Sequence, residues 1–163
     1  MGTSVADPTN RPDHFVDVVP TEWIDRNGHL DTIHYKSLVD RARRQLFDYL
    51  GLDRGHFASG FTLFNLEMHA LYEREIFGKE TICILSHVAG GADKVIHSFH
   101  EIFRPDDPRR CAGIELLTLH VDQATRRGTP FPPAIAARLQ QIAAEHSARP
   151  APQGLSSRIV LRP

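Results

Sequence analysis

The stretch Trp23 to Leu50, WIDRNGHLDTIHYKSLVDRARRQLFDYL, joins a turn to the start of a long helix. Asp31 or Thr32 suits the N-cap of that helix, and Gly51 suits the position just after its last turn. The helix is predicted by apolar residues that recur at steps of three and four, namely Tyr35, Leu38, Val39, Ala42, Leu46, Phe47 and Leu50. A helix over residues 32–50 therefore begins directly after a turn rich in polar side chains.

Strand-forming residues lie on both sides of this helix. His14 to Thr21 alternates loosely and stops near Pro20, which predicts a first strand. Short turn signals separate further runs of β-branched and aromatic residues, which predict an antiparallel meander over Phe61 to Arg74, Thr81 to Val88, Lys94 to Arg104 and Cys111 to Asp122. Pro133 to His146 has helical spacing and predicts a closing helix.

The order of these elements predicts an α+β protein. A helix with an apolar stripe, followed by a curved antiparallel sheet, buries both apolar surfaces when the sheet wraps around the helix. That arrangement, a curved antiparallel sheet around a long central helix, is the hotdog fold. We expect one domain over residues 14–146, between a polar tail at 1–13 and a weakly ordered tail at 147–163.

Composition excludes several classes of protein. The 163 residues are 41% hydrophobic and 24% charged with a formal net charge of -1, unlike a disordered chain or a basic nucleic-acid binder. The two cysteines form no C-x-x-C pair, so neither a disulfide framework nor a thiolate zinc site is expected. No apolar run approaches the ~20 residues of a membrane span, and no leader is apparent, so we expect a cytoplasmic protein without a membrane partner.

Two motifs connect the sequence to a known family. The first is W-I-D-R-N-G-H-L-D-x-x-H-Y from Trp23 to Tyr35, and the second is F-x-x-E-M-H-x-x-Y-x-x-E from Phe64 to Glu75. Together with the G-K-E turn, H-S-F-H and E-L-L-T-L-H-V-D downstream, they resemble hotdog acyl-CoA thioesterases of the 4-hydroxybenzoyl-CoA thioesterase type. Within that family the resemblance is greatest to the carnitine- and betaine-linked (betainyl-CoA) enzymes.

The resemblance implies an activity and a site. It implies hydrolysis of a small or medium acyl-CoA to a free acid and CoA, without a cofactor, by a homodimer or homotetramer. The aspartate at the position of Asp25 would attack the thioester or activate a water, while a backbone amide at the helix start polarises the carbonyl. The residues implied to line the site are Asn27, Gly28, His29, His34 and Tyr35.

Elementary electrostatics points to the same place. A helix N-terminus has unpaired N–H groups whose dipoles favour negative charge, so the amides of Thr32, Ile33 and His34 form a candidate oxyanion hole. Losing one such donor typically costs ~3 kcal/mol of transition-state stabilisation. Asp25 lies seven residues before Thr32, across a glycine-containing turn that can fold it back toward the helix. Gly28 would allow close backbone approach to the acyl group.

Structural interpretations of these residues stay open. Asp25 and Asn27 are also ordinary turn residues. Asp31, where relatives commonly have asparagine, is better suited as a helix cap than as a catalyst, although a second carboxylate would raise the pKa of one of the pair. Strict alternation places Asn65, Glu67 and His69 on one strand face, so Glu67 is either a secondary catalytic candidate supporting Asp25 or part of a solvated or subunit-facing surface.

The remaining polar and aromatic residues give weaker signals. His97 and His100 point to opposite strand faces, and His29 and His34 flank the helix start, so no metal site is expected. Trp23, Tyr35 and Tyr72 are candidates for a quaternary ammonium cage, or for core packing. Arginines near strand ends are candidates for the CoA phosphates, or are simply solvated: Arg104, Arg109, Arg110, Arg126 and Arg127.

Two other functions are compatible with the sequence. One is a non-catalytic hotdog protein that binds acyl-CoA or an acyl carrier, against which the presence of Asp25 argues. The other is a hotdog hydratase or dehydratase. That chemistry needs an Asp and His pair on the helix, whereas His29 and Asp31 precede it.

Overall fold

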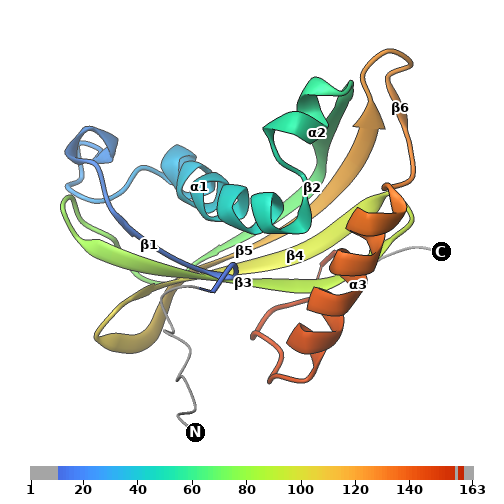
Figure 1. Cartoon of the computed structure of the whole chain (residues 1–163). Coiled ribbons are helices and arrows are strands. Elements are labelled where there is room, and N and C mark those ends of the chain that lie inside the picture. Colours follow the sequence, from blue (N-terminus) through green and yellow to red (C-terminus); the bar gives the residue numbers. More distant parts are fainter. Residues whose placement is uncertain (1–10, 157, 160–163) are drawn as a thin grey trace, which may run out of the picture.

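The computed structural model describes residues 11–156, 158 and 159, and it has the α+β hotdog fold predicted from the sequence. A curved antiparallel sheet wraps around helix α1 (Thr32–Leu50), and helix α3 (Pro133–Ser147) packs beside β3 near the C-terminal end of α1 (Figure 1). The strands are β1 (His14–Val18), β2 (Phe61–Tyr72), β3 (Thr81–Ala92), β4 (Val95–Arg104), β5 (Asp107–Asp122) and β6 (Arg127–Gly128).

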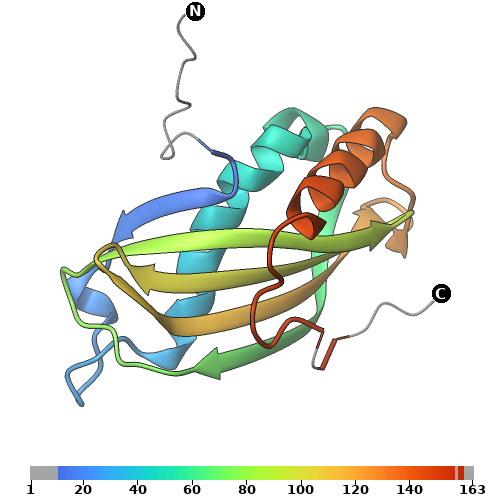
Figure 2. The same cartoon turned by 90° about the horizontal axis from the view of Figure 1, so that it is seen from below.

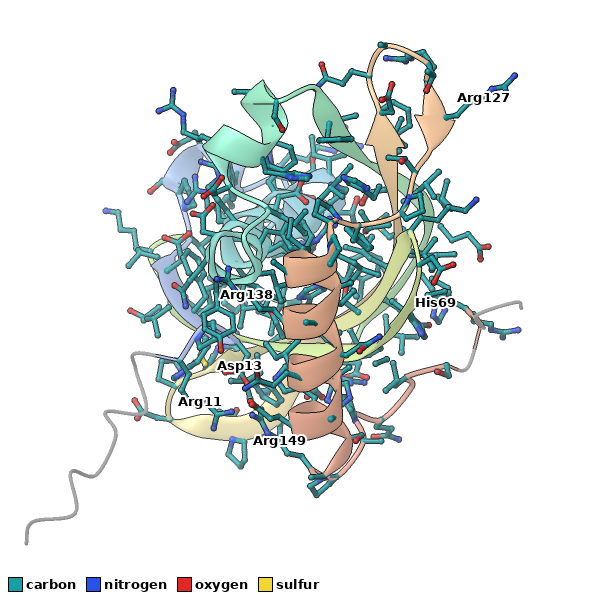
Figure 3. All side chains as sticks on the ribbon, turned by 45° about the vertical axis from the view of Figure 1, so that its right-hand side comes forward. Arg11, Asp13, His69, Arg127, Arg138 and Arg149 are labelled. Atoms are coloured by element: carbon teal, nitrogen blue, oxygen red, sulfur yellow. The ribbon has the colours of Figure 1, made fainter. Side chains whose placement is uncertain are left out.

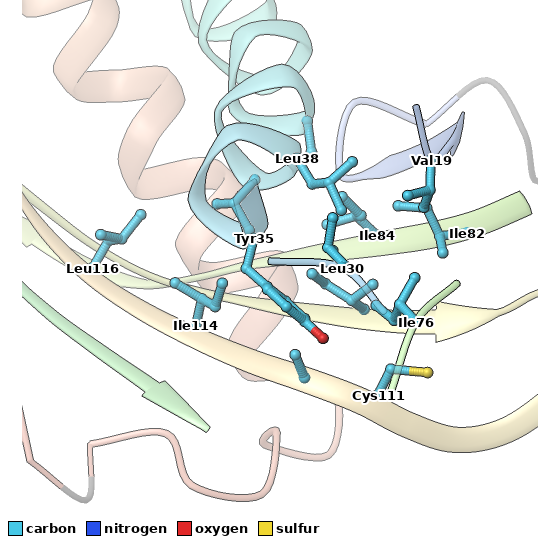
Figure 4. Close-up of a cluster of buried hydrophobic side chains, with 14 residues drawn as sticks. Val19, Leu30, Tyr35, Leu38, Ile76, Ile82, Ile84, Cys111, Ile114 and Leu116 are labelled. Carbon is cyan, nitrogen blue, oxygen red and sulfur yellow. The ribbon is translucent and has the colours of Figure 1, made fainter. Parts of the chain in front are cut away.

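Helix α1 has the bounds and the caps that the sequence predicts. The side chain of Asp31 accepts a hydrogen bond from the Ile33 amide at 3.1 Å, and Gly51 ends the helix in a left-handed conformation with φ of 90°. The apolar stripe faces the sheet. Its first half packs with Val19, Leu30 and the middle of the sheet (Figure 4), and its second half packs against α3. The helix is therefore the centre of the core.

The strand order differs from the predicted meander. Only β3, β4 and β5 follow one another; the sheet order is β1-β3-β4-β5-β2, so β1 and β2 are the two edges (Figure 2). The segment after β2 crosses the end of the sheet and buries Ile76 completely under the start of α1. The Leu30 amide donates to the Ile76 carbonyl at 2.7 Å. Among the described strands β2 pairs with β5 alone, so its other edge is free.

Three short elements were absent from the prediction. They are a 3-10 turn, η2 (Thr21–Trp23), the short helix α2 (Arg54–Ala58), and β6, which pairs with the end of β5. The turn predicted between Val88 and Lys94 is present but shorter, at Asp93 and Lys94, because β3 continues to Ala92 through a bulge between Val88 and Gly90. Short elements of this kind are set by tertiary contacts more than by local periodicity.

Both ends of the described chain contact the domain. Arg11 and Arg149 donate to the carboxylate of Asp13, and the three side chains lie together beside the end of α3 (Figure 3). After α3 the chain crosses the outer face of the sheet, where the Ser156 amide donates to buried Glu115 at 2.7 Å. Of the predicted polar tail at 1–13, residues 1–10 lie outside the described residues, as do 157 and 160–163 of the predicted C-terminal tail.

Candidate functional site

The turn before α1 folds back on itself. Ile24 and Leu30 form an antiparallel bridge, the Asp25 amide donates to the His29 carbonyl at 2.9 Å, and the Asp31 amide donates to the Trp23 carbonyl at 3.0 Å. Gly28 has φ of 90°, a left-handed conformation that favours glycine. These bonds hold Asp25 against His29, two residues before the Asp31 cap of the helix.

The carboxylate of Asp25 is held by one neighbour. The backbone amide of Asn27 donates to Asp25 Oδ1 at 2.7 Å, and its side-chain amide donates to Oδ2 at 3.0 Å. Desolvation acts to raise the pKa of Asp25, but these bonds and the nearby His29 outweigh it, so the pKa lies below its ordinary value. Asp25 is therefore ionised at neutral pH, and its side chain lies in a partly buried position.

The amides at the helix start are not equivalent. The Ile33 amide donates to the side chain of Asp31, and the His34 amide donates to the Asp31 carbonyl at 2.9 Å. For the Thr32 amide, no hydrogen-bond acceptor is found within the part of the chain that the structure describes. The three predicted donors are thus reduced to the Thr32 amide, because Asp31 acts as the cap.

A hollow of about 260 Å³ opens beside this amide. Its walls come from the turn, from the first turn of α1 and from the end of β2, and they consist of His29, Leu30, Thr32, Tyr35, Tyr72, Glu73, Arg74 and Glu75. The rings of Tyr35 and Tyr72 meet edge to face, with centroids 4.9 Å apart. Burial raises the pKa of Tyr35 to about 12, and its hydroxyl points away from α1 (Figure 4). The hollow thus combines two aromatic rings with the charged residues Glu73, Arg74 and Glu75.

Other candidates from the sequence lie elsewhere. Trp23 does not pack with the two tyrosines. Its ring stacks on the ring of His34, with centroids 4.7 Å apart, and the Cζ atom of Arg41 lies 4.5 Å from the Trp23 ring centroid. His97 bonds to Glu115 and His100 bonds to Ser86, which confirms that the two histidines face opposite sides of the sheet. Of the three aromatic residues considered for a cage, only Tyr35 and Tyr72 are in contact with each other in the described structure.

The position of Glu67 corrects the predicted strand alternation. A bulge between Asn65 and Glu67 makes Asn65 pair with Thr118, while Glu67 pairs with the next residue, Leu117. Asn65 consequently faces α1, where it bonds to Arg43, whereas Glu67 lies on the opposite face of the sheet. The expectation that these two side chains share a face is wrong, because one extra residue in a strand reverses the alternation.

Most of the arginines singled out in the sequence are held by carboxylates. Arg104 bonds to Glu80, Arg109 to Asp107, and Arg110 to Glu73 and Glu101. The guanidinium of Arg126 lies 5.1 Å from the ring centroid of Phe64, and Arg127 projects away from the body of the protein (Figure 3). Three of the five arginines, Arg104, Arg109 and Arg110, are thus already paired with carboxylates and are poorer candidates for a phosphate site.

A hollow of about 610 Å³ was not anticipated from the sequence. It lies between α1, α2 and β2, and the nearly buried Arg43 forms part of its wall. Arg43 donates to Asn65 at 3.1 Å and to Thr118 at 2.8 Å. The sequence contained one indication of this site, because Arg43 lies four residues after Val39 and therefore falls on the apolar stripe of the helix.

The described residues contain neither a candidate metal cluster nor a helix that could span a membrane. No cluster of three or more His, Cys, Asp or Glu side chains in this part of the chain is placed to hold a metal ion. No helix among these residues is long and apolar enough to cross a bilayer.

Known proteins were compared with the chain and with its fold. A family model described as thioesterase-like superfamily matches residues 19–139. A betainyl-CoA thioesterase from Pseudomonas aeruginosa is 32% identical over 143 residues, which cover 87% of this chain and 90% of that protein. An L-carnitine dehydrogenase/betainyl-CoA thioesterase from Agrobacterium fabrum is 28% identical over 76% of this chain, which spans 25% of that longer protein.

Solved structures give the same fold. A proposed thioesterase from Pseudomonas putida KT2440 has a TM-score of 0.77 and 28% identity, covering 91% of this chain and 96% of its own. A Staphylococcus aureus protein solved in complex with CoA has a TM-score of 0.82 over 92% of this chain and 95% of its own. Its sequence identity is 20%, so this comparison supports the fold alone.

Proposed function

The chain belongs to the thioesterase-like superfamily and is a thioester hydrolase, and from this premise we propose that it cleaves acyl-CoA to a free acid and CoA. The observation that carries the assignment of the site is the ionised Asp25, held by Asn27 in a turn that closes against the start of α1. An ionised carboxylate and a free helix-terminal amide are the nucleophile or base and the oxyanion donor that thioester cleavage needs.

In the proposed reaction, the thioester carbonyl lies between Asp25 and the amide of Thr32. A carboxylate oxygen of Asp25 attacks the carbonyl carbon, and the carbonyl oxygen takes up negative charge facing the Thr32 amide. The carbon–sulfur bond then breaks, CoA leaves as a thiolate that takes a proton from water, and a second water hydrolyses the resulting anhydride to free acid and Asp25. The alternative is that Asp25 removes a proton from the attacking water. The lowered pKa keeps Asp25 ionised, which both routes need.

The hollow beside Thr32 supports a compact cationic acyl group such as betainyl. Quaternary ammonium groups bind over aromatic faces by cation–π attraction, and Tyr35 with Tyr72 supplies such a surface. Glu75 borders the same hollow, and it has no ion-pair partner within the described residues. The name of the Pseudomonas aeruginosa relative agrees with this choice of substrate.

We also propose that the working unit is a homodimer joined through β2. This edge strand has twelve residues, one free side, and apolar side chains that are half-exposed, Leu66 at 50% and Met68 at 51%. A long apolar edge strand invites pairing with another strand, and two copies related by a twofold axis would join their β2 strands antiparallel. Glu67 lies on this edge, so any catalytic role for it would be exerted near the partner subunit.

A thiol-release assay tests the proposed function. Purified protein is mixed with acetyl-CoA, benzoyl-CoA and betainyl-CoA, and free CoA is measured as a thiol. We expect turnover that is fastest with betainyl-CoA. Absence of thiol release from all three would contradict the hydrolase proposal, and tight binding without turnover would instead support a binding protein.

A further inference from the structure

The hollow of about 610 Å³ between α1, α2 and β2 carries an excess of positive charge. Its cationic wall residues outnumber its carboxylates by four to two: Lys36, Arg43, Arg44 and Arg54 against Asp40 and Asp48. Helix α2 lies over the start of β2 at the C-terminal end of α1, and it forms one side of this hollow (Figure 1). The volume of about 610 Å³ is of the size that binds nucleotides and drug-sized ligands.

Arg43 differs from the other cations of the hollow because it is buried. Its side chain is 5% exposed, and its Nε has no hydrogen-bond partner within the described residues. The carboxylate that neutralises it is Asp40, at 3.2 Å, but Asp40 is 47% exposed and also binds Lys36. A buried guanidinium with such incomplete compensation favours an anion nearby, because burial of a charge is costly unless it is paired.

Arg44 and Arg54 differ from the arginines at the strand ends. Both are exposed wall residues of the hollow, and neither forms an ion pair with any residue that the structure describes. Arg104, Arg109 and Arg110 are each held by acidic side chains. Free guanidinium groups with several donors suit phosphate oxygens.

The position of the hollow fits a ligand that also reaches the start of α1. Lys36 borders the hollow one turn after Thr32, and Arg44 lies about 18 Å farther along α1 than Thr32 at 1.5 Å per residue. CoA has this layout, since its pantetheine arm separates the thioester from the phosphates. Phe47 and Phe57 add an apolar wall against which a base can pack.

We propose that this hollow binds the phosphorylated nucleotide end of CoA, with Arg44 and Arg54 contacting its phosphates and Arg43 supplying fixed positive charge behind them. The inference rests on the proposed function, because it takes CoA as the carrier of the acyl group. It assigns the phosphate site to α1 and α2, not to the strand ends.

Steady-state kinetics with two carriers of one acyl group test the inference. CoA has phosphates and N-acetylcysteamine has none, so a phosphate site affects only the first thioester. For the double variant Arg44→Ala/Arg54→Ala we expect KM for the acyl-CoA to rise about tenfold or more, equivalent to at least ~1.4 kcal/mol, with kcat nearly unchanged. KM for the N-acetylcysteamine thioester should stay the same. Arg127→Ala is the matched control, because Arg127 projects away from the body of the protein and does not line the hollow (Figure 3).

Two further outcomes decide the inference. Isothermal titration of CoA into the wild-type protein and the double variant should show the same loss of affinity, with added salt weakening the wild-type binding. Equal effects on both thioesters, or unchanged KM and unchanged CoA affinity, would overturn the proposed site. If the wild-type protein cleaves neither thioester, the proposed function fails, and the CoA titration still decides the binding site by itself.

Discussion

Asn27 bonds to both carboxylate oxygens of Asp25, through its backbone amide at 2.7 Å and its side-chain amide at 3.0 Å. This relationship fixes the direction of the carboxylate in a turn that also closes against the helix cap. Aspartate and asparagine are both common in turns. The carboxylate oxygens of Asp25 that accept the hydrogen bonds of this turn are also the atoms proposed to act on the thioester.

Replacing Asp25 with asparagine should abolish most of the activity. The amide cannot attack or take a proton, so we expect kcat/KM to fall about a hundredfold or more, as measured by thiol release. The melting temperature should change little, because asparagine also suits the turn. Asp31→Asn is the control, since asparagine caps helices as well as aspartate does. Full activity in a folded Asp25→Asn protein would rule out the proposed role.

Replacing Asn27 with alanine should shift the pH dependence. The bonds from Asn27 lower the pKa of Asp25, so their loss should raise that pKa toward its ordinary value. The active form is ionised, and activity is lost as pH falls through this pKa. The acid limb of the kcat/KM profile should therefore move to higher pH in Asn27→Ala. An acid limb at the wild-type position would show that Asn27 does not tune this carboxylate.

Substituting Tyr72 should weaken recognition of a cationic acyl group selectively. The comparison uses betainyl-CoA and 3,3-dimethylbutanoyl-CoA, which replaces the charged nitrogen with carbon at the same shape. A cation–π contact contributes about 1 kcal/mol, so Tyr72→Leu should lower kcat/KM about fivefold for betainyl-CoA and much less for the neutral analogue. Glu75→Gln should act in the same direction. Equal losses on both substrates would indicate that Tyr72 contributes shape alone.

Charged residues on the edge of β2 should dissociate the proposed dimer. Leu66 and Met68 are half-exposed there, and aspartates in their place would repel across a twofold axis. Light scattering after gel filtration should give the mass of a dimer for the wild-type protein and of a monomer for Leu66→Asp/Met68→Asp. Tyr49→Asp, on the exposed side of α1, is the control and should leave the mass unchanged. A monomeric wild-type protein would exclude the dimer.

Removing the carboxylate of Asp13 should destabilise the fold. Desolvation acts to raise the pKa of Asp13, but bonds from His146, Arg149 and Arg11 hold it well below its ordinary value. Asp13→Asn should lower the free energy of unfolding at pH 7 by about 2 kcal/mol, because Asp13 is buried and its carboxylate accepts charged hydrogen bonds from Arg11 and Arg149.

The pH dependence of this stabilisation has a definite sign. A lowered pKa in the folded state gives stability that is fully present above the unfolded pKa, about 4 for aspartate, and is lost as pH falls toward the folded pKa. The difference between wild type and Asp13→Asn in urea unfolding should therefore be constant near neutrality and shrink in acid. A difference that grows below pH 4 would contradict this assignment.

The sequence by itself determined the central helix and the turn that precedes it. Helical spacing from Tyr35 to Leu50, the Asp31 cap and Gly51 depend on contacts only a few residues apart, so they can be read locally. The same holds for the position of Asp25 in its turn, where Asn27 and Gly28 set the backbone.

Only the tertiary structure decided which strands are neighbours and which side chains meet. The edge position of β2 follows from its long-range pairing with β5 alone, and the bulge before Glu67 turns that residue away from α1. The hollow around Arg43 combines α1, α2 and β2, whose residues are far apart along the chain. Long-range pairing sets all three features, because one inserted residue or one crossing changes neighbours without changing the local pattern of apolar residues.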